Sequence, residues 1–119
     1  MTNVENLEEI LVGIEKVDGV SDALLVSRSG MHIAGDVPKG AHTETFVAMS
    51  AILLGAAETA TSELKEKLKH VNIELDRSTI VIATISARAL LVLKLNPETD
   101  SEKILADIRQ QVQKMEEFL

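Results

Sequence analysis

The stretch VNIELDRSTIVIATISARALLVLKL, residues 71–95, decides the fold of this 119-residue chain. Residues 71–76 alternate apolar and polar side chains, which predicts a strand with one buried face. Residues 79–85 and 89–95 are aliphatic on both faces, and short turns separate the three segments. Strands that are apolar on both faces must be covered on both faces. We therefore expect helices on each side of a mostly antiparallel sheet.

The residues before this stretch predict a helix, a hairpin of two strands and a second, longer helix. The first helix has apolar residues three and four positions apart, and Thr2 or Asn3 can cap it. The hairpin turns at Arg28-Ser29-Gly30, where glycine is free to take positive φ. The expected elements cover residues 4–17, 20–27, 31–34 and 43–69.

A last helix is expected after Asn96 and Pro97. Thr99 and Glu102 have the spacing of a capping box, and an apolar stripe runs from Ile104 towards the C-terminus. The predicted order is α-β-β-α-β-β-β-α, an α+β fold with a central five-stranded sheet. Residues 1–119 are expected to form a single domain, since this length is usual for one domain.

Composition excludes several classes of function. The net charge is −7, and only 2% of the residues are aromatic, so the chain lacks the basic and stacking surface of a nucleic-acid binder. The absence of cysteine excludes disulfides and zinc–thiolate sites. The acidic N-terminus does not resemble a signal peptide, and the apolar run 46–57 is too short for a bilayer. We therefore expect a cytoplasmic protein without membrane insertion.

No catalytic, cofactor or metal site is expected. Gly35 and Gly40 have the spacing of a phosphate-binding loop, but the lysine and hydroxyl residues that should follow are missing. His32, His42 and His70 lie on separate elements without ligand spacing. The carboxylates are scattered along polar helix faces, whereas acid–base chemistry needs paired groups in a cleft. The sequence therefore predicts a protein that is not an enzyme.

The middle of the long helix is apolar nearly all round. Between Val47 and Ala57 only Ser50 is polar, and Gly55 is the other non-apolar position. A helix that packs on one surface needs a single apolar stripe, so this helix is expected to be buried on more than one side. In a small domain, the surface that buries the second side of this helix is most simply another chain.

Residues 27–34, SRSGMHIA, resemble the first hairpin of the roadblock/dynein light chain family. Residues 64–95 are also similar, and the order of elements matches over essentially the whole chain. The resemblance implies a roadblock/profilin-like fold that dimerises through its third strand and long central helix. The residues that would form this dimer interface are Phe46, Met49, Ser50, Leu53, Leu54, Ala57, Val71, Ile73 and Leu75.

The same resemblance implies a function. Members of this family are non-enzymatic adaptors that bind Ras-like small GTPases or serve in motor and signalling complexes, and simple members form homodimers. The partner surface would lie on the long helix, with Glu44, Glu58, Ser62 and Lys65 as its exposed residues. A glutamate in place of Leu54 is then expected to leave a dissociated or aggregated chain.

Two other functions remain open from the sequence. A small-molecule sensor would enclose a ligand in the aliphatic core, where Thr79 and Thr84 are the uncharged polar groups that the double-sided strands offer. A small enzyme would need titratable groups that meet in a cleft from distant positions of the chain.

Overall fold

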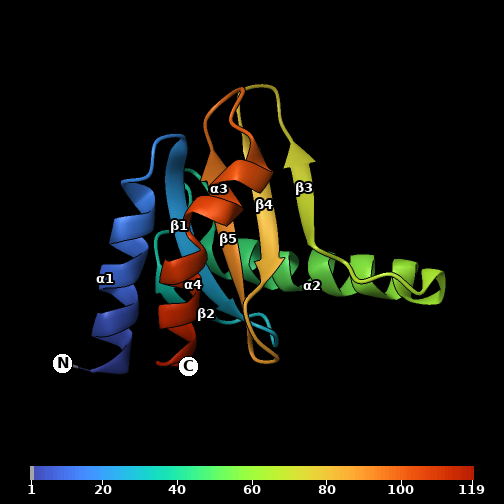
Figure 1. Cartoon of the computed structure of the whole chain (residues 1–119), viewed down its shortest axis with the longest axis horizontal. Helices are drawn as coiled ribbons and strands as arrows, with labels where there is room; N and C mark the ends of the chain where they lie inside the picture. Colours follow the sequence, from blue (N-terminus) through green and yellow to red (C-terminus); the bar gives the residue numbers. More distant parts are fainter. Residues whose placement is uncertain (1) are drawn as a thin grey trace.

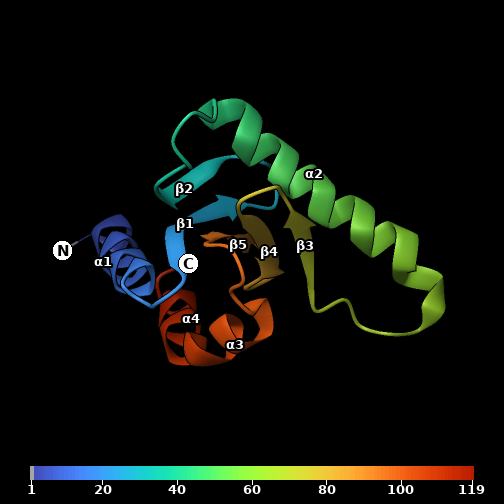
Figure 2. The ribbon, with the colours of Figure 1, turned by 90° about the horizontal axis from the view of Figure 1, so that it is seen from above.

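A computed structural model describes residues 2–119 and shows three layers. A five-stranded sheet in the order β2-β1-β5-β4-β3, with every neighbouring pair antiparallel, separates one long helix from three shorter ones (Figures 1 and 2). The predicted α+β class and the sheet are confirmed. The elements are α1 (Asn3–Glu15), β1 (Val20–Ser27), β2 (His32–Gly35), α2 (Thr43–Thr61), the 3-10 turn η1 (Ser62–Leu64), β3 (His70–Glu74), β4 (Thr79–Thr84), β5 (Ala89–Leu95), α3 (Ser101–Asp107) and α4 (Arg109–Glu116).

The two faces of the sheet bury two separate apolar clusters. Helices α1, α3 and α4 pack on one face, where Leu91 and Leu93 of β5 are buried. Helix α2 packs on the other face, where Val92 of the same strand and Ile82 of β4 are buried. Alternate residues of one strand thus enter opposite cores, which confirms the expectation that the aliphatic strands are covered on both faces.

The long helix is shorter than predicted. It ends at Thr61 rather than Lys69, and the chain reverses through Lys65, whose φ of 58° is left-handed. The hydroxyl of Thr61 donates to the carbonyl of Ala57 at 2.8 Å, and that of Ser62 donates to the carbonyl of Thr59 at 2.9 Å. Such bonds compete with the helix ladder, and the lysine-rich residues that follow have no sheet face to cover.

The last helix also differs from the prediction. Asp100, rather than Thr99, is the N-cap, and its carboxylate accepts the backbone N–H of Glu102 at 3.0 Å. The helix then breaks at Ile108 into α3 and α4. At the other end of the chain, Thr2 is the cap of α1, and its hydroxyl accepts the N–H of Glu5 at 3.1 Å.

Two carboxylates fasten α1 to the sheet. Glu8 accepts the backbone N–H of Gly35 at 3.0 Å, and Glu15 accepts that of Ala23 at 3.3 Å. Gly35 has a φ of 90°, and a Cβ added there would lie 2.4 Å from the carbonyl oxygen of Ala23. Glycine is therefore required at the end of β2, where it pairs with Leu24 of β1.

Glu15→Gln is expected to stabilise the fold at neutral pH. Burial, together with Asp36, Asp22 and Glu8, raises the pKa of Glu15, although its hydrogen bond with Ala23 lowers it. A carboxyl whose pKa is raised on folding favours the native state below its unfolded pKa, and this contribution is lost as pH rises through the folded pKa. The glutamine keeps an acceptor for Ala23 without the charge.

We expect Glu15→Gln to raise the free energy of unfolding at pH 7, and we expect this gain to shrink as the pH falls towards 4. Urea unfolding at the two pH values measures it, with Glu9→Gln on the exposed side of α1 as the control. A loss of stability at pH 7 would show that the bond to Ala23 outweighs the cost of burial.

Candidate functional site: helix α2 and the edge strand β3

An apolar stripe lies exposed along α2, on the side that does not face the sheet. Met49, Ile52 and Leu53 are 46%, 57% and 40% exposed, and the exposed Ala56 and Ala60 continue the spacing of three and four residues. Contiguous exposed apolar surface of this kind is typical of an interaction site. The prediction of excess apolar surface on this helix is therefore confirmed.

The sheet-facing side of α2 is closed within the chain. Leu54 is 1% exposed and lies in the cluster with Ile82 of β4 and Val92 of β5, and Ser50, one turn earlier, is 3% exposed. The hydroxyl of Ser50 donates to the carbonyl of Phe46 at 2.8 Å. Leu54 and Ser50 were expected at the dimer interface. That placement is wrong, because the chain's own sheet occupies this side of the helix.

The segment Thr43–Leu64 is long and apolar enough, by length and composition alone, to cross a membrane. Its mean hydropathy reaches 1.2, and only 17% of that window is buried within the chain. The core helix of a globular domain passes the same test, and this helix lies across a sheet that it covers (Figure 2). Its exposed apolar residues are the feature that any function must explain.

Strand β3 forms the free edge of the sheet next to this stripe. Among residues 2–119 it pairs with β4 only, so no strand of the described chain pairs with its outer backbone groups. Val71 and Ile73 are half-buried on the α2 side, whereas Leu75, just past the strand, is 54% exposed. Helix α2 runs on beyond β3, so its C-terminal part overhangs the edge of the sheet (Figures 1 and 2).

The four polar residues predicted for partner binding do not form one patch. Glu44 is exposed in the first turn of α2, while Ser62 and Lys65 are exposed beyond its last turn. Those ends are about 28 Å apart, because an α-helix rises 1.5 Å per residue over the 19 residues of α2. Only Ser62 and Lys65, with the neighbouring Glu58, share one end of the helix.

Glu58 holds the first hairpin against α2. Arg28, in the turn after β1, donates to both carboxylate oxygens of Glu58, at 2.7 and 3.2 Å, and to the hydroxyl of Thr84 at 3.0 Å. The hydrogen bond from Arg28 and its positive charge lower the pKa of Glu58. Nothing in the local pattern of the sequence indicated this pair, since 30 residues separate the two side chains. From the sequence, Ile52, Ala56 and Ala60 were also not identified as exposed residues, although their helical spacing could have indicated this.

The sensor and enzyme alternatives gain no support from the geometry. Thr84 is exposed and hydrogen-bonded to Arg28, so it does not line the aliphatic core. Among residues 2–119, no three histidine or acidic side chains gather as metal ligands would. The feature that most needs a partner is the exposed stripe of α2 beside the β3 edge.

Comparisons with known proteins give the fold and the family. An uncharacterized protein of Methanocaldococcus jannaschii is 28% identical over 104 residues, which span 87% of this chain and 84% of that protein. An MglB structure with a tetrameric arrangement matches with a TM-score of 0.85 at 21% identity, covering 100% of this chain and 94% of that one. The gliding protein MglB from Thermus thermophilus matches at 0.84 and 20% identity, covering 99% and 91%.

The family model described as Roadblock/LC7 domain matches residues 6–95. This range begins in α1 and ends with β5, so it contains the hairpin, the long helix and the whole sheet. Helices α3 and α4 lie outside it, yet Ile104, Ile108 and Met115 are buried in the same core as α1. The model thus spans the hairpin, residues 27–34, and the other segment that first indicated the resemblance, residues 64–95, and the chain belongs to the Roadblock/LC7 domain family.

Proposed function

We propose that the protein is a non-enzymatic, homodimeric adaptor that regulates a Ras-like small GTPase in the cytoplasm. The observation that carries the proposal is the exposed apolar stripe of α2, a helix that runs on beyond the unpaired edge strand β3. Membership of the Roadblock/LC7 domain family supports a regulatory rather than a catalytic role. The resemblance stated above supplies the expectation of a GTPase partner.

A second copy of the chain fits both open surfaces at once. Two β3 strands that pair through their outer edges would join two sheets, and each overhanging α2 would cover part of the partner's sheet and lie against its twin. The same surface then serves both copies, as a two-fold interface requires. The residues available for this contact are Phe46, Met49, Ile52, Leu53, Ala56, Ala57, Val71, Ile73 and Leu75.

The GTPase is proposed to bind along the polar margins of the paired α2 helices. The apolar stripe would be buried between the copies, which leaves the charged ends of each helix accessible. The residues at those ends are Glu44, Glu58, Ser62 and Lys65. In an antiparallel pair, Glu44 of one copy would approach the Lys65 end of the other, so that dimerisation joins two halves of one surface.

A binding measurement with purified small GTPases of the source organism tests the partner. The immobilised protein is expected to bind one Ras-like GTPase more tightly in its GTP-analogue form than in its GDP form. Lys65→Glu should weaken this binding at least tenfold, because it reverses an exposed charge on the proposed surface, whereas Lys114→Glu on α4 should leave it unchanged. A dimer that binds no such GTPase in either nucleotide state would contradict the proposed GTPase partner, but it would not contradict the proposed dimer.

A further inference from the structure

A groove opens on the face of the sheet opposite α2, where the layer of shorter helices stops before the edge strand. The register pairs His70 with Ala83 and Asn72 with Val81, so the polar residues of β3 face this side. Strand β3 contributes no side chain to the core beneath α3 and α4. The edge strand is therefore left uncovered on this face, beside the wall formed by α3 and α4.

Two adjoining hollows make up this groove. One has a volume of about 330 Å³ and lies between α3 and the start of β3. The other has a volume of about 340 Å³ and lies between α4 and the ends of β4 and β5. Three residues line both hollows and therefore mark the centre of the groove: Lys69, Leu105 and Arg109.

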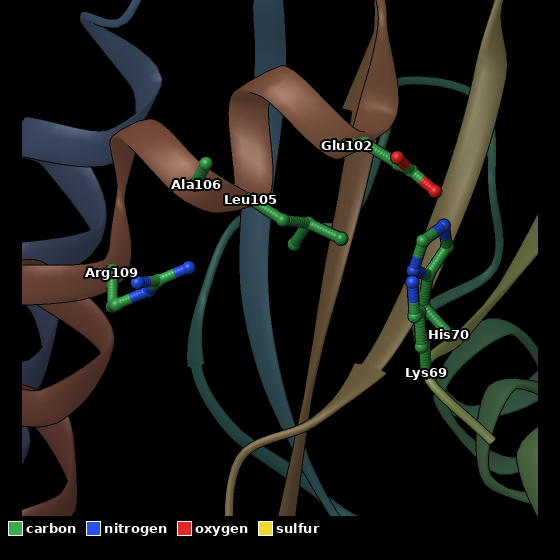
Figure 3. A pocket seen from close by; sticks show the side chains of 6 residues that line it. All are labelled: Lys69, His70, Glu102, Leu105, Ala106 and Arg109. Carbon is green, nitrogen blue, oxygen red and sulfur yellow. The ribbon is translucent and has the colours of Figure 1, made fainter. Parts of the chain in front are cut away.

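The centre of the groove combines two cations with an apolar side chain. Figure 3 shows Leu105 and Arg109 extending from the helices towards the gap, with Lys69 and His70 on the opposite side. Within residues 2–119 the ion pairs are Arg28–Glu58 and Lys103–Asp107, so Lys69 and Arg109 have no carboxylate partner within the chain. Two such cations face each other across a groove in a protein whose net charge is −7.

The ends of the groove carry the opposite charge. Glu102 lines the first hollow, where Figure 3 shows it near the imidazole of His70, and Glu116 lines the second. Glu102 is on the first turn of α3 and Glu116 is the last residue of α4, so the two acids lie at opposite ends of the helical wall. Along the groove the charge therefore runs from acidic through basic and apolar to acidic.

We propose that this groove binds a short segment of a partner protein that has acidic residues beside an apolar residue at its centre. The apolar side chain lies on Leu105, and the carboxylates lie between Lys69 and Arg109. An Arg–carboxylate hydrogen bond is stronger than a neutral one, and its fork geometry adds specificity. Basic residues at the ends of the segment complement Glu102 and Glu116.

This site is independent of the proposed dimer and of the GTPase. The groove uses the face of β3, not its outer edge, and it lies on the side of the sheet opposite α2. It stays open in a monomer and in a dimer that pairs through β3. A result that contradicts the groove therefore leaves the proposed dimer and GTPase partner unaffected, and the reverse also holds.

Titration of the full-length, isotope-labelled protein with synthetic peptides, followed by amide NMR shifts, tests the groove. The probe is a blocked nine-residue peptide with a Leu-Glu-Glu centre and a lysine at each end, and its counterpart has a Leu-Lys-Lys centre and terminal glutamates. The first peptide should produce saturable shifts at residues 69–70 and 105–109. The charge-inverted peptide should bind at least tenfold more weakly.

Lys69→Glu combined with Arg109→Glu should weaken binding of the peptide with the Leu-Glu-Glu centre at least tenfold. The charge-inverted peptide should then bind more tightly than that peptide. The matched control reverses two exposed cations outside the groove, Arg88→Glu with Lys114→Glu, and should change neither affinity. Ala106→Trp, which fills the first hollow without changing a charge, should also abolish binding. The proposal is overturned by the absence of saturable shifts, by shifts that map to α2, or by an equal loss in the control.

Discussion

Leu53→Glu is expected to convert the proposed dimer into a folded monomer. Leu53 is 40% exposed on the apolar stripe of α2, so a glutamate there remains solvated while the chain is alone. In the dimer the same carboxylate would be removed from water opposite apolar side chains, which is costly without a partner charge. Because a two-fold interface contains the position twice, the cost is doubled.

A cost of about 2 kcal/mol per copy, counted twice, weakens association by roughly a thousandfold. Sedimentation velocity at micromolar concentration measures this loss of association. Circular dichroism should show an unchanged helix content and a thermal unfolding midpoint that does not depend on protein concentration. Gln110→Glu adds the same charge to an exposed polar position of α4, on the opposite face of the sheet, and should leave the dimer intact. A Leu53→Glu protein that still sediments as the wild type would exclude this face of α2 from the interface.

Leu54→Glu, one residue further along, is expected to prevent folding. Leu54 is 1% exposed and lies in the cluster formed with Leu24, Val26 and Ile82. Removing a buried leucine side chain alone costs about 2–5 kcal/mol, and a buried carboxylate without a partner adds to that. A domain of this size is stable by about 5–15 kcal/mol, so most or all of its stability is lost.

From the sequence alone we expected this substitution to leave a dissociated or aggregated chain, and the burial of Leu54 against its own sheet now predicts loss of the fold instead of dissociation of folded chains. Far-UV circular dichroism and urea unfolding, compared with Leu53→Glu, distinguish loss of fold from loss of partner. A Leu54→Glu protein with wild-type helix content and a cooperative urea transition would contradict this packing. The two substitutions place the same charge on adjacent residues and are expected to fail in different ways.

The strands could be predicted because their signal is local. The bounds of β4 and β5 follow the aliphatic runs 79–85 and 89–95 to within one residue, since burial on both faces requires apolar residues at nearly every position. The end of α2 could not be predicted in this way. Residues 65–69 have good helix formers, but no surface of the chain lies where a longer helix would pack.

For the candidate interface, the sequence could identify the helix and the strand that take part, but not which of their side chains face outward. Its helix and strand follow from excess apolar surface and from half-polar alternation, which are properties of each segment alone. The groove between β3 and α4 left no such signal, because Lys69 and Arg109 lie 40 positions apart in the sequence. In the sequence, each of them is an ordinary exposed cation. Only the packing of the sheet against the helices brings them to one site.

By itself, the sequence determined that this protein has a sheet covered on both faces and a helix with more apolar surface than one side can bury. Which side of that helix faces outward was decided only by the tertiary structure. A helix that is apolar nearly all round carries no periodicity to orient it. Its rotation is set by contacts with distant segments: the sheet beneath Leu54, and the Arg28–Glu58 pair that ties the hairpin to the helix.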